Sequence, residues 1–581
     1  MVFLKPNMPR IDVTEWLTHG RSERIKPMAR HIAENGMGNP DVFYVLYSVK
    51  IGLYILGGVF FVLSTQGIDG WGTIGTWWNE PIVFQKVVLW SLLFEVLGLG
   101  CGFGPLTGKI APPMGSPLYW LRPGTIRLAP WPNRIPLTGG DRRVMFDVVL
   151  YGALLGSAVF ALLSDGAGSI AGLGTSIGMI PPERIVAVLV VLAVIGLRDK
   201  VIFLATRGEV YGSLTVTFLF AGSNMIVAAK LVMLAIWIGA ATSKLNRHFP
   251  FVVATMMANN PLVRARWMKR MFFRRFPDDL RPGRIPEFLA HFGTLIEMGV
   301  PLVLFFSHGG VVTYVAAFIM IVFHLVILTA IPLGVPLEWN VFMLFGICWL
   351  FVDKAGIGWG AVTEPWPIAA LSAVILTTIV IGNFCPTKVS FLPGMRYYAG
   401  NWDTSQWFFT EAASQKLADR RIGLGLVQHK QIEKLSTPEG TLISLSLGHA
   451  FRAMYAHGRA LMTLWEHVIP AGRDADYTVI DGEPVAGYAV GWSFGDGHLH
   501  NEQLINALQR RCHFEPEELR VLIVDGQAIH QQRQQYRIVD AATGELERGT
   551  FRVIDVVRRQ PWEHDVPITV TRKSTPVTDQ R

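Results

Sequence analysis

The sequence has few charged residues and few cysteines. Only 17% of its 581 residues are charged and 51% are hydrophobic, a balance that excludes an ordinary soluble protein of this length. The four cysteines lie far apart along the chain, so the spacing suggests neither a disulfide framework nor a cysteine-based metal knuckle. The sequence also lacks a P-loop, a nucleophile elbow, a dinucleotide-binding fingerprint and a nucleic-acid-binding motif. The enzyme classes and nucleic-acid partners that these motifs mark are therefore not indicated.

A cleavable signal peptide is not expected either. The first forty residues are rich in lysine and arginine and lack a short apolar core followed by a small-residue cleavage site. We expect residues 1–41 to form an N-terminal segment at the membrane interface, with a solvated leader as the equally weighted alternative.

Long apolar runs fill most of the remaining sequence. A helix needs about twenty apolar residues to cross the hydrocarbon layer. We expect spans at residues 42–63, 82–103, 144–163, 185–197, 285–306, 311–330, 336–352 and 368–384. The stretch from 198 to 244 holds either one span or a double passage. The sequence therefore predicts a polytopic helical membrane bundle of 8 to 10 helices over residues 42–384.

Basic residues are concentrated in two long loops between these runs. Residues 104–143 contain six, and residues 244–284 contain about ten. Such loops lie on the cytoplasmic side of a plasma (inner) membrane, so we expect a multi-pass protein with a cytoplasmic N-terminus. The net charge of +8 favours contact with anionic membrane lipids.

From residue 385 onward the charge density rises and no run reaches membrane length. We expect residues 385–581 to form a soluble α+β domain on the cytoplasmic side. Helical patterns cover residues 405–417 and 447–468. Strand patterns cover residues 477–480, 485–492, 519–524, 536–539 and 549–557, with DAATGEL as the turn of a hairpin.

Lys244 is the leading candidate for chemistry in the bundle. It ends the apolar run that starts at Asn224, and Lys230 and Trp237 precede it at intervals of seven on one helical face. A dry membrane boundary disfavours the charged form of an amine, which makes the amine a usable base. The alternative is a lysine that caps the helix and extends its amine to the membrane surface.

Two later spans carry further ionisable residues. His291 and Thr294 share a helical face, Glu297 lies on the same helix, and His324 lies in the next span. Ionisable groups inside membrane segments are costly and often functional. Two imidazoles near a lysine can relay a proton or bind a quinone carbonyl. Histidines that merely connect helices are the alternative.

The soluble part contains one candidate for metal binding. Asp496, His498 and His500 lie within five residues, and alternate histidines on a strand can ligate zinc or iron. No third and fourth protein ligand is evident beside them. The alternative is a loop that caps a helix over residues 501–511.

Three segments resemble one known domain. IWIGAATSKLNRHFP (236–250), AHFGTLIEMGVPLVLFF (290–306) and FHLVILTAIPLGVPLEWNVFMLF (323–345) are similar to the transmembrane (HTTM) domain of vitamin K-dependent gamma-carboxylases. The resemblance implies that Lys244 is the catalytic lysine and that the cofactor is a quinol, here of the menaquinone type. The C-terminal part does not resemble the animal enzyme, so we expect an uncharacterised bacterial membrane family, with actinobacteria among the candidate sources.

Two hypotheses follow. In the first, the protein is a membrane enzyme with Lys244, His291 and His324 as catalytic residues and Trp237, Thr294 and Glu297 around the cofactor. In the second, it is a non-catalytic component that binds lipid or a protein partner, or forms a homo-oligomer. A transporter is disfavoured because the sequence shows no pair of broken helices in matching halves.

Overall fold

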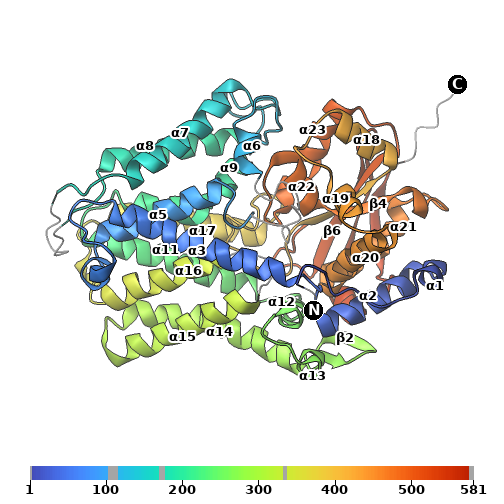
Figure 1. Ribbon diagram of the computed structural model, residues 1–581, viewed down its shortest axis with the longest axis horizontal. Helices are drawn as coiled ribbons and strands as arrows, with labels where there is room; N and C mark the ends of the chain where they lie inside the picture. The colour runs from blue at the N-terminus through green and yellow to red at the C-terminus, as the bar shows by residue number, and fades with distance from the viewer. Residues whose placement is uncertain (1–2, 103–114, 169–176, 331–336, 575–581) are drawn as a thin grey trace.

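A bundle of helices carries an α+β domain at one end (Figure 1). The protein is described by a computed structural model that covers residues 3–102, 115–168, 177–330 and 337–574. The predicted fold class, a helical membrane bundle with a C-terminal α+β domain, is confirmed. The predicted end of one span at residue 103 and the start of another at residue 336 lie outside the described residues.

Six helices in the described residues are long and apolar enough to cross a membrane. They are α3 (Asp41–Leu63), α7 (Met145–Leu162), α11 (Ser223–Ser243), α14 (Arg284–Phe306), α15 (Gly310–Ala330) and α17 (Pro365–Phe384). Helix α11 is 78% buried over its apolar window, whereas the other five are 22–33% buried. Helix α11 is therefore enclosed by protein, and the other five have apolar faces available to lipid.

Shorter or broken helices also run between the two ends of the bundle. Two of them are single helices, α5 (Pro81–Val96) and α8 (Pro182–Arg198). A third passage consists of the consecutive short helices α9 (Lys200–Ala205), η3 (Gly208–Gly212) and α10 (Ser213–Thr217). The fourth consists of α16 (Leu337–Gly346) and its continuation η4 (Ile347–Asp353). Both η3 and η4 are π-helical. These four passages and the six long helices make ten in the described residues, within the predicted range of 8 to 10.

The stretch from 198 to 244 makes the double passage. Helix α9 begins at the domain end of the bundle, where the amide of Lys200 donates to the carbonyl of Leu128 at 2.8 Å. Helix α10 continues toward the opposite end, and α11 returns. The basic loop after Lys244 consequently lies at the same end as the C-terminal domain (Figure 1).

The N-terminal segment and this basic loop both pack against the C-terminal domain. Their elements are α1 (Val13–Thr18), α2 (Arg21–Asn35), α12 (Phe249–Asn259), α13 (Arg266–Arg270), β1 (Phe273–Arg275) and β2 (Asp279–Pro282). Helix α2 packs on α20 (Pro438–Met454). The amide of Leu280 donates to Gln560 Oε1 at 2.9 Å. Segments far apart in the sequence therefore build the domain end together.

The domain contains a six-stranded antiparallel sheet in the order β4-β3-β5-β6-β7-β8. The strands are β3 (Thr404–Phe409), β4 (Thr478–Asp481), β5 (Leu519–Val524), β6 (Arg533–Asp540), β7 (Gly544–Arg552) and β8 (Ile568–Lys573). Successive side chains of β3 face opposite sides. Phe408 packs on Trp465 of α21 (Ala456–Val468), whereas Trp407 and Phe409 join the core on the other side. Helices thus cover both faces of the sheet.

The strand predicted at 549–557 is wrong after Arg552, because β7 ends there and a helix follows. Two further predictions are corrected by the remaining helices of the domain. These helices are α18 (Glu411–Asp419), α19 (Gln428–Leu435), α22 (Gly482–Val490), α23 (Glu502–Cys512) and α24 (Val553–Arg558). The predicted strand at 485–492 is wrong, because α22 covers most of it and ends where Gly491 adopts φ +86°. The predicted helix at 405–417 is wrong in its first half, because β3 precedes α18 and Thr410 caps α18. Alternation over so few residues does not distinguish a short helix from a strand.

Candidate functional site

A cavity of about 60 Å³ lies among α11, α14, α15 and α16, and we call it the bundle cavity. Helix α11 contributes Trp237 and Lys244, α14 contributes Glu297, and α15 contributes His324. Four residues singled out in the sequence therefore face the same space, although they come from three helices.

Lys244 is the C-cap residue of α11, and its side chain turns into protein. Its Nζ lies 2.5 Å from Glu297 Oε2, and the two side chains are only 9% and 7% exposed. The amine also lies 5.5 Å from the centre of the Phe249 ring. The pair brings opposite charges together in a nearly dry place, where each stabilises the charged form of the other.

His324 is held between two hydrogen-bond partners. Trp237 Nε1 donates to His324 Nε2 at 3.0 Å, and His324 Nδ1 lies 2.9 Å from Asn340 Oδ1. Because Nε2 accepts, the proton of the neutral ring is on Nδ1 and is donated to Asn340. The ring is therefore fixed in one tautomer and orients the indole of Trp237.

The other two residues predicted on α14 lie outside the bundle cavity. His291 is exposed, next to the exposed, stacked rings of Phe288 and Phe292. Thr294 is buried, and its hydroxyl donates to the carbonyl of Ala290 within the helix, at 2.8 Å. The structure thus brings Lys244, Glu297, His324 and Trp237 together and leaves His291 on the outer face.

A larger cavity of about 470 Å³ lies between the bundle and the domain, and we call it the interface cavity. Its walls come from the N-terminal segment, the start of α3, α12, the segment after α17, α19, α20, β4 and the start of α22. Its lining is mainly apolar, and its volume is within the range of about 300–1,000 Å³ typical of ligand sites.

One corner of the interface cavity is polar. Arg452 of α20 donates from Nε to Asp481 Oδ2 at 3.0 Å, and Glu483 lines the cavity beside this pair. Burial raises the pKa of Glu483 to about 7, and Arg452 opposes this rise. His449 also lines the cavity and hydrogen-bonds the carbonyl of Val479 at 2.9 Å. The corner therefore holds one guanidinium and a carboxyl group that is partly neutral at physiological pH.

Tyr398 and Phe494 line both cavities. Their rings contact each other edge to face, with centroids 6.3 Å apart. Two side chains therefore lie between the Lys244–Glu297 pair and the larger interface cavity.

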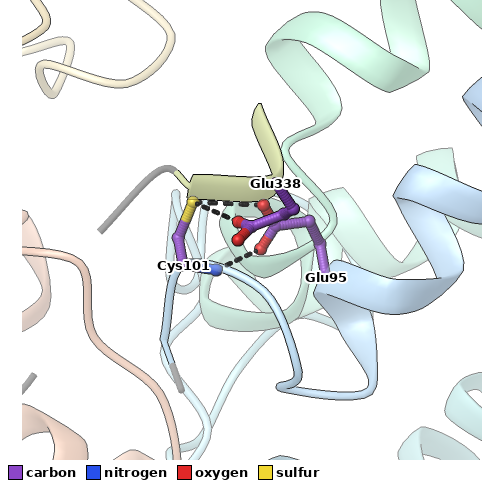
Figure 2. A group of neighbouring side chains, drawn as sticks. All are labelled: Glu95, Cys101 and Glu338. Atoms are coloured by element: carbon purple, nitrogen blue, oxygen red, sulfur yellow. Dashed lines mark hydrogen bonds between the residues drawn. The ribbon is translucent and has the colours of Figure 1, made fainter. Parts of the chain in front are cut away.

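A third cluster lies deep in the bundle and joins Glu95, Cys101 and Glu338 (Figure 2). Cys101 Sγ lies 3.1 Å from Glu95 Oε1 and 3.2 Å from Glu338 Oε1, and the amide of Cys101 donates to Glu95. All three residues are fully buried. Within the described ranges, this is the one group of three such side chains whose ligand atoms converge closely enough to hold a metal ion.

Two cations neutralise this cluster. Lys50 Nζ lies 2.9 Å from Glu338 Oε2, and Arg207 Nη1 donates to Cys101 Sγ at 3.2 Å. Arg207 Nε also donates to Glu209 Oε1 at 2.7 Å. The Lys50–Glu338 pair joins α3 to α16 across the bundle. Hydrogen bonds and an ion pair already join these groups, so the cluster forms a buried polar network.

The predicted metal residues in the domain point to separate partners. His498 Nε2 hydrogen-bonds the carbonyl of Pro386 at 2.8 Å, and His500 Nδ1 hydrogen-bonds Ser405 Oγ at 2.7 Å. Asp496 Oδ1 accepts from the amide of His498. The alternative prediction, a capped helix, is confirmed, because Asn501 caps α23.

Sequence reasoning missed Arg207, Glu338, Arg452 and Glu483. Arg207 lies in a short polar stretch between α9 and η3, and Arg452 lies on an amphipathic helix, where an arginine usually faces water. The weak signal for Glu338 was an acid beside an apolar run, where ionisable residues are costly and often functional.

Comparison with protein families matches residues 1–571 to the family described as transmembrane protein of unknown function (DUF3556). No curated protein and no solved structure matches the chain. The predicted uncharacterised membrane family is thereby confirmed. The resemblance to gamma-carboxylases stays a prediction.

Proposed function

The chain belongs to the DUF3556 family of transmembrane proteins, and we propose that it is a membrane enzyme acting on a lipophilic substrate of the quinol type. The observation that carries this proposal is the convergence of Lys244, Glu297 and His324 on the bundle cavity. Burying the charged side chains of Lys244 and Glu297 costs free energy. Stability alone therefore does not account for this cluster.

The proposed chemistry is proton transfer from a ring hydroxyl. Glu297 Oε2 lies 2.5 Å from Lys244 Nζ at the cavity wall, and we assign Glu297 the role of proton acceptor. The O–H bond of the hydroxyl breaks, the proton moves to Glu297, and the ammonium of Lys244 stabilises the oxygen anion. His324 acts through Trp237, whose indole it orients at the cavity wall.

A lipophilic substrate fits the surroundings of this pair. Tyr398, Phe494 and Trp339 line the bundle cavity, and the first two open onto the larger apolar space. An aromatic ring can stack on such side chains while its hydroxyl meets the charged pair.

Replacing Lys244 by methionine is expected to weaken quinol binding about tenfold or more. The variant removes the cation that stabilises the oxygen anion and leaves Glu297 without its partner. The measurement is anaerobic calorimetric titration of menadiol into purified protein in neutral detergent.

His291→Gln is the matched control. His291 is exposed on the neighbouring face of α14, so this variant is expected to bind menadiol like the parent protein. Absence of binding to the parent protein, or equal binding by the Lys244→Met variant, would contradict the proposal.

A second candidate is a non-catalytic protein that holds a lipid for a larger complex. The observation favouring it is that Lys244 and His324 already have partners while the neighbouring interface cavity is large and apolar. In that case the Lys244→Met variant would retain lipids that co-purify with the parent protein and would not differ from it in menadiol titration.

For localisation, we propose that the domain end of the bundle faces the cytoplasm of a bacterial cell. Residues 115–143 and 244–284, with five and about ten basic residues, lie at this end, whereas residues 64–80 contain none. Cys385 is the exposed one of the four cysteines and follows α17 at the domain end. A membrane-impermeant maleimide is expected to label Cys385 only after cell lysis, and labelling of intact cells would refute this orientation.

A further inference from the structure

We propose that the interface cavity binds a single-chain anionic amphiphile, whose carboxylate or phosphate lies against Arg452 and Glu483 and whose chain lies along the apolar wall. This site is separate from the Lys244 centre and does not depend on quinol chemistry. It gives the protein a second ligand, one that meets the first at the shared wall formed by Tyr398 and Phe494.

Arg452 supplies the anion-binding group. Its side chain is 11% exposed, and only its Nε is engaged, by Asp481. Among the described residues, the structure gives the two Nη nitrogens of Arg452 no hydrogen bond, and the side chain lines the cavity. A guanidinium with two unengaged nitrogens offers the planar donor fork that binds carboxylate or phosphate.

Glu483 completes the polar corner, and in its neutral form it does not repel an anion. It lies at the first turn of α22, and Arg452 and Asp481 are the charged groups that act on it. Burial favours its neutral form. A neutral carboxyl group can donate a hydrogen bond to the second oxygen of a carboxylate or phosphate. The anion thus finds a cation and a donor next to each other.

The remaining walls suit a hydrocarbon chain. They include Met8 and Phe43 from the N-terminal side, Met256 of α12, and Leu447 and Phe451 of α20. Methionine side chains adapt readily to flexible apolar ligands. Leu435, which is 72% exposed, lines the same cavity and gives it an apolar edge at the surface. Because the cavity lies where the bundle meets the domain, a chain can pass into it from the membrane surface.

Gly448 offers a way to fill the cavity without disturbing the fold. It lines the interface cavity within α20, and a Cβ at this position would meet no atom of another residue within 4 Å. Replacement by leucine therefore places a side chain in the space assigned to the ligand, and it suits a helix better than glycine does.

The test is photolabelling of the full-length protein in neutral detergent with a diazirine analogue of palmitate, followed by peptide mapping. We expect label on peptides from α20 and from the N-terminal wall. Excess palmitate or hexadecyl phosphate should reduce the labelling, and the better competitor of the two identifies the preferred head group. Hexadecanol, which has no anionic head group, should not reduce the labelling. Arg452→Gln and Gly448→Leu should each lower labelling of these peptides at least tenfold.

Arg552→Gln is the matched control, because Arg552 also pairs with an aspartate, Asp555, but is 61% exposed. Its labelling should equal that of the parent protein, and all variants should show the parent's unfolding temperature within a few degrees. Label confined to the outer faces of α14 and α15, equal competition by hexadecanol, or unchanged labelling of both cavity variants would overturn the proposal. If Arg452→Gln fails to fold, Gly448→Leu decides alone.

Discussion

Replacement of Arg207 by methionine is expected to lower the free energy of unfolding by about 3–5 kcal/mol, the range found when one partner of a buried ion pair is removed. Arg207 is 1% exposed and contacts Glu209 and Cys101, and its guanidinium lies 4.1 Å from the centre of the Trp339 ring. Without it, Glu209 loses its cation, and the acid-rich cluster around Cys101 keeps only Lys50.

The measurement is thermal unfolding in detergent, followed by tryptophan fluorescence. Arg207→Lys is the control, because it keeps the charge but loses the planar fork and the stacking on aromatic rings. Its unfolding temperature should fall between those of the parent and Arg207→Met. An unchanged unfolding temperature for Arg207→Met would show that the cluster does not depend on this cation.

A second large effect is expected at Gly458, where alanine should destabilise the protein by about 3 kcal/mol, the upper part of the range for overpacking. A Cβ at Gly458 would lie 1.8 Å from the carbonyl oxygen of Arg452, which is backbone and cannot rotate away. The junction between α20 and α21 would have to move, and with it the polar corner of the interface cavity.

Gly448→Ala is the matched substitution on α20 and should act in the opposite direction. Its Cβ meets no atom of another residue within 4 Å, so the ordinary gain of about 0.5–1 kcal/mol for replacing glycine in a helix is expected. Unfolding of both variants side by side checks the pair. A shift of the unfolding temperature in the same direction for both alanine variants would contradict this pair of predictions.

The long helices could be predicted because membrane spans are set by local apolar length. α3, α14, α15 and α17 each begin or end within a few residues of the predicted limits. The same locality explains why Lys244, Glu297 and His324 were found, since a charge inside an apolar run is conspicuous in the sequence. Their convergence on one cavity required the structure, because helix packing decides which faces meet.

The interface cavity and the buried ion pairs could not be predicted, because they depend on contacts between segments that lie far apart in the sequence. Arg452 lines a cavity with Met8 and Met256, which lie far from it in the chain. Glu338 pairs with Lys50 across the bundle. In the domain, α22 was misread as a strand, since residues 485–492 (VAGYAVGW) form a short apolar run that fits either a strand or a buried helix.

The ten passages of the bundle bring the N-terminal helices and the C-terminal sheet to the same side. A fluorescent protein fused ahead of α1 and another fused beyond β8 would therefore report from one compartment. Split halves of a reporter placed at these two positions would reassemble within a single molecule.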